Sequence, residues 1–150
     1  MKKRILLYGF YGIANAGNEA MLRALIEPIR EKYADDIEFI VANRHPNDDY
    51  DKQYGVKSIP NLEYDSREMA KGRWLRGLNP DDSPVFMEML REVAYSDLVI
   101  LGPGQYLVET GEFGLLKGSL AQFHVLLTMA KITDTPFYAL AMACEPLFSP

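Results

Sequence analysis

The chain has 150 residues, of which 48% are hydrophobic and 25% are charged, and it carries a formal net charge of −5 at neutral pH. This length suffices for one domain with a sizeable core and not for two, so we expect a single domain over residues 1–150. The negative net charge argues against general nucleic-acid binding. No apolar run is long enough for a membrane span. The single cysteine, Cys144, excludes an intramolecular disulfide and a cysteine-only zinc site.

The first third of the chain predicts a strand, a helix and a second strand. Residues 4–8 and 37–42 are apolar without alternation, which is typical of strands buried on both faces. Residues 18–33 carry apolar side chains at helical spacing. Pro28 should kink this helix or end its first segment, because proline lacks a backbone donor. The expected apolar stripe consists of Met21, Leu22, Leu25, Ile26 and Ile29.

The middle third is less regular. Residues 47–61 are polar and broken by Asp, Gly and Pro, with a short third strand expected at 55–59. Residues 66–78 predict a helix that Ser66 can cap. Ser83 and Pro84 form a cap and first-turn pair for another helix. The stripe expected to be buried on that helix is Phe86, Met87, Leu90, Val93 and Ala94.

The last third predicts a strand, a helix and a strand. The fourth strand, residues 98–101, stops at the loop Gly102-Pro103-Gly104-Gln105. A helix is expected from about residue 116 to 132, and a fifth strand at 137–143, which Glu145-Pro146 ends.

Strands that alternate with helices predict a parallel sheet covered on both faces, connected by right-handed crossovers. The expected architecture is a three-layer Rossmann-like α/β fold. The order of its strands stays open, and 3-2-1-4-5 is one option. In that order strands one and four are neighbours at the topological switch point, where open α/β sheets bind ligands beyond the carboxyl ends of their strands. We therefore expect the loops at residues 9–18 and 102–105 to converge on one crevice.

The loop at residues 9–18 leads from a strand into a helix. Such a loop directs free backbone N–H groups and the positive end of a helix dipole at one place, which suits an anionic or polyhydroxyl ligand. Gly9, Gly12 and Gly17 have the spacing G-x-x-G-x-x-x-x-G, which differs from the G-x-G-x-x-G fingerprint of dinucleotide-binding loops.

Two motifs resemble those of the polysaccharide pyruvyl transferase family. The run Tyr11-Gly12-Ile13-Ala14-Asn15-Ala16-Gly17-Asn18-Glu19-Ala20 matches the signature Y-G-x-x-N-x-G-D-E-A, except that Asn18 replaces the family's Asp. A second landmark, a D-L-V-I strand followed by a triple-glycine loop, is matched by residues 97–100 with Gly102-Pro103-Gly104 in place of the glycines. Glu145-Pro146 stands where the family has Gly-Pro. The chain is thus similar to the N-terminal half of a two-domain fold of the GT-B type, with the C-terminal half absent.

This resemblance implies transfer of a pyruvyl group from phosphoenolpyruvate to two hydroxyls of a sugar in a cell-surface polysaccharide or its precursor. It implies no cofactor and no metal, since phosphoenolpyruvate is the donor substrate. It also implies a sugar acceptor that is lipid-linked in some members of the family, and a cytoplasmic location, with a place at the inner face of the membrane as one option. Further catalytic groups would come from the missing C-terminal domain or from a partner chain, for instance in a homodimer.

Candidate site residues lie at the ends of the predicted strands. Glu19 is either a general base or a first-turn acid that complements the helix dipole. Arg44 and His45 follow the second strand and can reach a carboxylate or phosphate, or they are solvated surface residues. Glu145 is either an acid–base group or a harmless departure from the family. The expected substrate-binding residues of the two loops are Gly12, Asn15, Gly17 and Asn18, and Gly102, Pro103, Gly104 and Gln105.

Simpler explanations exist for these loop residues, because Asn15 and Asn18 can cap the helix and the glycines can serve the turns. Two further functions stay open. One is a GT-B-like glycosyltransferase domain, which would bind a nucleotide sugar in place of phosphoenolpyruvate. The other is a non-catalytic module that binds sugar or phosphate or forms a dimer, and that shows no turnover with any ligand.

Overall fold

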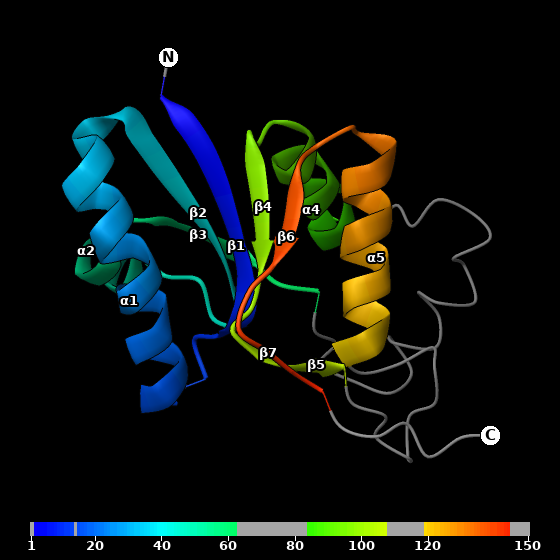
Figure 1. Ribbon diagram of the computed structural model, residues 1–150, viewed down its shortest axis with the longest axis horizontal. Coiled ribbons are helices and arrows are strands. Elements are labelled where there is room, and N and C mark those ends of the chain that lie inside the picture. Colours follow the sequence, from blue (N-terminus) through cyan, green and yellow to red (C-terminus); the bar gives the residue numbers. More distant parts are fainter. Residues whose placement is uncertain (1, 14, 63–83, 108–118, 145–150) are drawn as a thin grey trace.

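The computed structural model describes residues 2–13, 15–62, 84–107 and 119–144, with the side chains of all of these except residues 35, 105–107, 119–121 and 143–144. Figure 1 shows one twisted sheet with α1 and α2 on one side and α4 and α5 on the other. Its five strands are all parallel and have the order β3-β2-β1-β4-β6. The predicted three-layer Rossmann-like fold is therefore confirmed, and the strand order is the 3-2-1-4-5 option that the sequence left open.

The strands of the main sheet are β1 (Lys3–Tyr11), β2 (Ile37–Asn43), β3 (Lys57–Pro60), β4 (Leu98–Leu101) and β6 (Phe137–Ala139). A second sheet pairs β5 (Gly104–Leu107) with β7 (Met142–Cys144). The helices are α1 (Ala16–Tyr33), α2 (Asp48–Tyr54), α4 (Pro84–Ala94) and α5 (Ser119–Ile132), and the turn η1 (Ala34–Asp36) follows α1.

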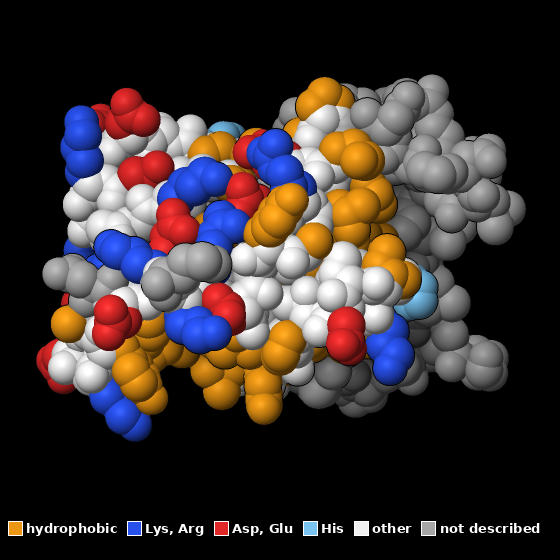
Figure 2. Space-filling view, turned by 90° about the horizontal axis from the view of Figure 1, so that it is seen from above, with side chains coloured by type: hydrophobic (Ala, Val, Ile, Leu, Met, Phe, Trp, Pro, Cys, Tyr) orange, Lys and Arg blue, Asp and Glu red, His pale blue; other side chains and the backbone are white. Residues whose placement is uncertain are grey.

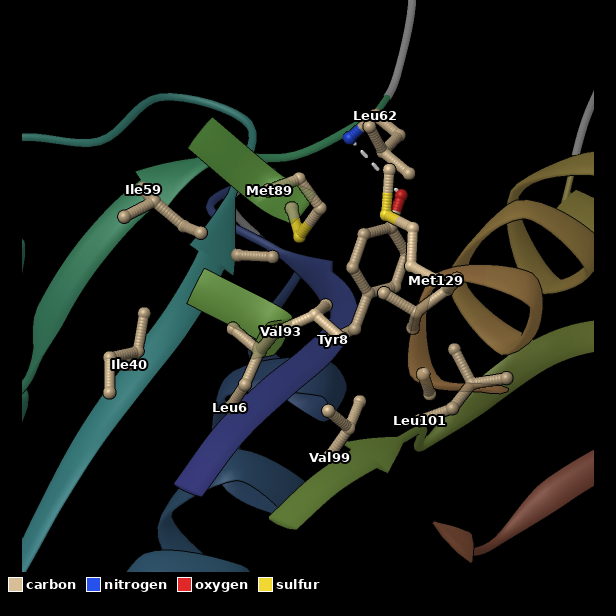
Figure 3. Close-up of a cluster of buried hydrophobic side chains, with 13 residues drawn as sticks. Leu6, Tyr8, Ile40, Ile59, Leu62, Met89, Val93, Val99, Leu101 and Met129 are labelled. Atoms are coloured by element: carbon tan, nitrogen blue, oxygen red, sulfur yellow. Dashed lines mark hydrogen bonds between the residues drawn. The ribbon is translucent and has the colours of Figure 1, made fainter. Parts of the chain in front are cut away.

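Strand β1 is the centre of the sheet and is buried on both faces, which explains its unbroken apolar run. Leu6 and Tyr8 face α4 and α5, and Ile5 and Leu7 face α1. Two cores result, one on each side of the sheet. The α4 and α5 side includes Ile40, Ile59, Met89, Val93, Val99 and Met129 (Figure 3), and the α1 and α2 side includes Leu22, Ile26, Phe39, Val41 and Tyr54.

Tyr8 adds hydrogen bonds to the apolar core around it. Its fully buried hydroxyl accepts the backbone N–H of Leu62 at 3.2 Å and donates to Oε1 of Gln122 at 2.9 Å. The hydroxyl thus joins β1 to the segment after β3, as Figure 3 shows, and to α5 through Gln122. A buried phenol needs such partners, because an unpaired hydroxyl in the core is costly.

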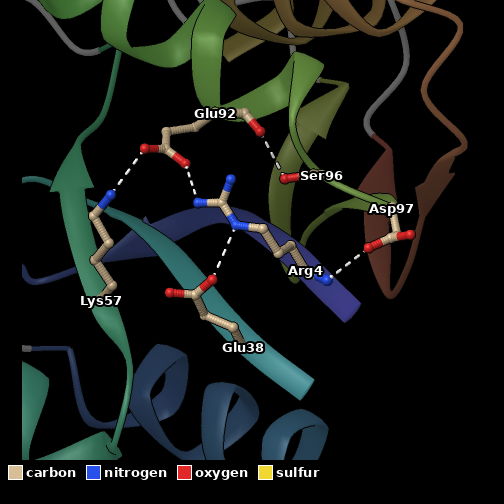
Figure 4. A network of polar contacts seen from close by, with 6 residues as sticks. All are labelled: Arg4, Glu38, Lys57, Glu92, Ser96 and Asp97. Carbon is tan, nitrogen blue, oxygen red and sulfur yellow. Dashed lines mark hydrogen bonds and ion pairs between the residues drawn. The ribbon is translucent and has the colours of Figure 1, made fainter. Parts of the chain in front are cut away.

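A network of charged side chains lies at the amino-terminal edge of the sheet (Figure 4). Glu92 of α4, whose side chain is 5% exposed, accepts from Nη2 of Arg4 at 2.6 Å and from Nζ of Lys57 at 2.8 Å. Arg4 also contacts Glu38 through Nε at 2.9 Å. Figure 2 looks onto this edge and shows acidic and basic side chains gathered there. The network joins α4 to three strands of the sheet.

Two predicted boundaries in the first third were wrong. Strand β1 continues past Tyr8 through a bulge, so that Tyr11 pairs with Asn43. Helix α1 begins at Ala16 and not at residue 18, because Asn15 caps it. Pro28 does not end the helix, which continues to Tyr33. The predicted loop at residues 9–18 is therefore reduced to residues 12–15.

Helix α2 was missed within the polar stretch at residues 47–61. It is short, and its contact with the rest of the domain comes mainly from two tyrosines, Tyr50 and Tyr54, so it has no long apolar stripe. The local signals were nevertheless present. Asn47 caps the helix by accepting the N–H of Tyr50, acidic residues fill the first turn, and Gly55 ends it in a left-handed conformation. Strand β3 follows at Lys57–Pro60, two residues later than predicted.

The carboxyl-terminal part also differs from the prediction. Residues 102–105 are not all loop, because β5 begins at Gly104. The predicted fifth strand is divided at Ala141, where φ is +51°, into β6 of the main sheet and β7 of the second sheet. On α4 the predicted Val93 is buried, as is Met89, which was not predicted, whereas Met87 is 49% exposed and Ala94 is exposed. The predicted helix at 66–78, the Ser83 cap, the helix start near 116, the Cys144 thiol and Glu145 lie outside the described residues.

Candidate functional site

The two glycine segments meet at the carboxyl edge of the sheet, as predicted. Strands β1 and β4 are neighbours, and the N–H of Gly102 donates to the carbonyl of Tyr8 at 2.8 Å. The buried hydroxyl of Tyr11 donates to the carbonyl of Gly102 at 2.7 Å. The side chain of Tyr11, which is 0% exposed, thus lies at the switch point itself and links the end of β1 to the end of β4. Sequence reasoning gave Tyr11 no role.

Gly102 allows β4 and β6 to approach each other closely. Its φ is +112°, and a Cβ on it would lie 2.0 Å from the carbonyl oxygen of Leu140. After Gly102 and the buried Pro103, the chain enters β5, where Gly104 pairs with Met142. The glycines of this segment therefore serve strand packing, and contact of Gly102, Pro103 or Gly104 with a ligand stays a prediction. The side chain of Gln105 lies outside the described residues.

The first turn of α1 is closed by Asn15. Its Oδ1 accepts the N–H groups of Gly17 at 3.0 Å and Asn18 at 3.3 Å, and its carbonyl accepts the N–H of Glu19 at 3.1 Å. Asn18 Nδ2 donates to the carbonyl of Phe10 at 2.8 Å. These bonds give both asparagines structural roles, and much of the donor capacity of the helix N-terminus is used within the protein.

Gly12 lies between Asn43 and Glu19. Its φ is +75°, and a Cβ on it would lie 1.7 Å from Oδ1 of Asn43, so glycine is required here. The N–H of Gly12 donates to Oε1 of Glu19 at 3.0 Å. The site residue Gly12 is therefore in contact with the candidate base Glu19, as the short loop between β1 and α1 requires.

Glu19 also fastens α2 to α1. Its Oε2 accepts the hydroxyl of Tyr50 at 3.0 Å, and the Tyr50 ring packs on Tyr54 with ring centroids 4.6 Å apart. Burial, together with the negative charge of Glu19, raises the pKa of Tyr50 and of Tyr11 well above that of a free tyrosine. Both phenols stay protonated at neutral pH and act as donors. These two bonds make Glu19 a positioning residue for the loop and α2, and its role as a base stays a prediction.

Arg44 and His45 lie directly after β2, at the same edge. The N–H of Arg44 donates to the carbonyl of Tyr11 at 3.2 Å, and the N–H of His45 donates to Oδ1 of Asn43 at 2.7 Å. Both residues are exposed. The structure thus brings their backbone to the end of β1, as predicted, while contact of their side chains with a ligand stays a prediction.

A hollow of about 540 Å³ lies at the opposite, amino-terminal edge. Apart from Lys2, the charged groups in its wall already have partners: Lys57 pairs with Glu92, Glu38 pairs with Arg4, and Arg30 donates to the carbonyl of Gly55. Parallel α/β sheets bind ligands at the carboxyl ends of their strands. We therefore place the candidate site at the carboxyl edge, around Gly12, Glu19 and Asn43.

Neither a metal cluster nor a membrane helix is found in the described ranges. Among those residues no three His, Cys, Asp or Glu side chains are grouped so as to hold a metal ion. No helix there combines the length and the apolar character that crossing a bilayer requires. Comparison with models of known protein families and with curated proteins found no match to this chain.

Proposed function

We propose that this domain is the acceptor- or donor-binding part of a pyruvyl transferase that uses phosphoenolpyruvate and a sugar of a cell-surface polysaccharide or its precursor. The observation that supports the proposal best is the direct contact of the two glycine segments, through Tyr8, Tyr11 and Gly102, at the switch point of the sheet. These are the segments that carry the two motifs on which the resemblance rests.

The reaction needs no redox change and balances without a further reactant. One sugar hydroxyl attacks C2 of the enol while a proton adds to the methylene carbon, which becomes a methyl group. A second hydroxyl then attacks the same carbon and displaces phosphate, giving a cyclic ketal. One of the two hydroxyl protons ends in the methyl group and the other leaves with the phosphate, so the protein must supply proton transfer and cationic groups.

The described residues supply part of these proton-transferring and cationic groups. Arg44 and His45 are exposed at the carboxyl edge and are suited to an anionic oxygen. Glu19 is half-buried beside the same loop, and each of its oxygens already accepts one bond and retains a second lone pair for a hydroxyl proton. Further cationic groups would come from a second domain or a partner chain.

The test is a phosphate-release assay with phosphoenolpyruvate and a panel of sugars, run on the chain with any further domain that its gene encodes. Ketal formation is checked by mass spectrometry. The chain offers a matched pair of variants, since it has two histidines, both exposed. His45→Ala, at the carboxyl edge, should lower the rate about tenfold or more, whereas His124→Ala on α5 should leave it unchanged.

Absence of phosphate release with every sugar would refute the transferase. Saturable binding of a nucleotide sugar without binding of phosphoenolpyruvate would favour the GT-B-like glycosyltransferase domain. Binding of sugar or phosphate without any turnover would favour a non-catalytic module.

A further inference from the structure

Asn43 is a buried polar residue whose side chain is only half satisfied. It is the last residue of β2 and is 0% exposed. Its Oδ1 accepts the N–H of His45, but Nδ2 has no hydrogen-bond partner among the described residues. A buried donor without a partner costs about 1–3 kcal/mol, and native proteins contain few of them. Such a group at the carboxyl edge of the sheet, where α/β folds bind ligands, calls for a partner that the described residues do not provide.

The amide lies against the loop between β1 and α1. Its nitrogen is 3.1 Å from the place that a Cβ of Gly12 would occupy, so the absence of that Cβ is what makes room for it. On the other side, the N–H of Gly12 bonds to Glu19. The unpaired amide of Asn43 and the carboxylate of Glu19 therefore lie on either side of Gly12, close to the N-terminus of the 18-residue helix α1.

The negative charge of Glu19 beside Gly12 favours a neutral ligand. Glu19 would repel a phosphate or carboxylate group placed beside Gly12. The N–H groups of Gly17, Asn18 and Glu19, which an anion would use at a helix N-terminus, are already bonded to Asn15. A hydroxyl differs from an anion in that it accepts from an amide and donates to a carboxylate at the same time.

We propose that Nδ2 of Asn43 donates to a hydroxyl oxygen of a bound sugar, and that Glu19 accepts the proton of that hydroxyl or of its neighbour. This rests on the proposed function and deepens it, because it assigns the loop at Gly12 to the neutral sugar and not to phosphoenolpyruvate. The amide nitrogen is buried next to Gly12, so the sugar reaches it when Gly12 and Ile13, which belong to no helix or strand, move aside. Asn43 then determines specificity for a hydroxyl at that position.

The experiment follows the side-chain NH₂ resonances of Asn43, which are assigned by triple-resonance spectra of the ¹³C,¹⁵N-labelled wild-type chain. The probes are the methyl glycosides of glucose, galactose, mannose and N-acetylglucosamine, with inorganic phosphate and phosphoenolpyruvate as the anionic arms. We expect a saturable shift of the Asn43 pair with at least one glycoside and none with either anion. The glycoside should bind Asn43→Ser and Asn43→Asp roughly tenfold or more weakly, as loss of one satisfied buried bond implies.

Ser58→Ala is the matched control, because Ser58 Oγ on β3 is the other buried side-chain atom without a partner in the described part of the chain. It should leave glycoside binding unchanged. A shift of the Asn43 pair with phosphate or phosphoenolpyruvate would overturn the proposal, as would no shift with any glycoside. The wild-type titration decides the matter even where a variant does not fold.

The two proposals fail separately. A glycoside that binds through Asn43 while phosphoenolpyruvate is not consumed leaves the role of Asn43 intact and refutes pyruvyl transfer. Ketal formation with an unchanged KM for the sugar in Asn43→Ser refutes the role of Asn43 alone.

Discussion

The phenol of Tyr11 and the carbonyl of Gly102 are joined by a buried hydrogen bond of 2.7 Å, although the two residues are 91 positions apart in the chain. This bond connects the ends of the two central strands at the switch point. Tyr11→Phe keeps the ring and removes the hydroxyl, so the Gly102 carbonyl loses the hydrogen bond that Tyr11 donates to it. We expect a loss of about 1–3 kcal/mol in the free energy of unfolding, measured by urea denaturation. Tyr95→Phe, at a tyrosine that is 68% exposed, should change it by less than about 0.5 kcal/mol. Equal effects of the two variants would contradict the importance of the bond.

Gly12 and Gly17 belong to the same motif but should differ in their tolerance of alanine. In Gly12→Ala the new Cβ meets Asn43 Oδ1 at 1.7 Å and the backbone has a positive φ, so a loss of about 2 kcal/mol or more is expected. Gly17 is helical, and its Cβ would come no closer than 3.2 Å to Asn15 Oδ1. Gly17→Ala should therefore stay within about 1 kcal/mol of the wild type. Thermal unfolding of both variants checks this, and a larger loss for Gly17→Ala would contradict it.

Asn18→Asp introduces the residue that the pyruvyl transferase signature has at this position and should nevertheless destabilise this chain. The amide of Asn18 donates to the Phe10 carbonyl, whereas an aspartate would present a second acceptor to it. The expected loss of about 1–3 kcal/mol exceeds the gain of about 0.3–1 kcal/mol from a negative charge in the first turn of α1. Urea denaturation measures the difference, and Asn18→Gln is a control that keeps an amide. A more stable Asn18→Asp would contradict the assigned bond.

Glu92 should make stability depend on pH. Burial alone would raise the pKa of Glu92, but the hydrogen bonds and charges of Lys57 and Arg4 outweigh it and hold the pKa below its usual value. The stability that these pairs contribute is then fully present above the ordinary carboxyl range and is lost as pH falls through the lowered pKa of the folded state. Glu92→Gln should cost about 1–3 kcal/mol at neutral pH.

The measurement is urea unfolding over a series of pH values, in which the curves of the wild type and of Glu92→Gln should converge toward acid. Glu27→Gln is the control, since Glu27 is exposed and lies 4.0 Å from Arg23. A gap between wild type and Glu92→Gln that stays constant down to acid pH would argue against a lowered pKa.

Glu19→Gln should lower the pH at which Tyr50 ionises. Burial contributes most to the raised pKa of Tyr50, and the charge of Glu19 adds to it, so removing the charge removes part of the increase. Near-ultraviolet absorbance during an alkaline titration measures the change. Glu31→Gln, an exposed position on the same helix, should leave the curve as it is. An unchanged curve in Glu19→Gln would mean that Glu19 and Tyr50 are not in contact in solution.

The fold could be predicted from the sequence because the buried strands carry the clearest patterns. Residues 98–101 matched β4 in full, and the alternation of strands and helices indicated the parallel sheet, although it left the strand order open. What could not be predicted depends on contacts between distant residues. The division of the last strand follows from the approach of Leu140 to Gly102, and the burial of Glu92 from partners on β1 and β3.

The candidate site was predicted in outline and not in its contacts. The sequence placed Gly12 and Asn15 in one loop and Glu19 in the first turn of the helix that follows. The partners of Gly12 and Glu19, Asn43 and Tyr50, come from other elements. Tyr50 lies on α2, which has no long apolar stripe to indicate that it packs on α1. Asn43 stands beside Arg44 and His45, whose charges made them the more obvious candidates. A buried amide without a partner is recognised only when its surroundings are known.

The two outer strands of the main sheet, β3 and β6, are four and three residues long. Pro60 ends the first and Pro136 directly precedes the second, and proline cannot donate a ladder hydrogen bond. In the described part of the chain, neither edge strand therefore offers a second molecule a long row of unpaired backbone N–H and C=O groups. Such a row is the template on which sheets aggregate. The domain should accordingly withstand the high concentrations that the titrations with weakly binding sugars require.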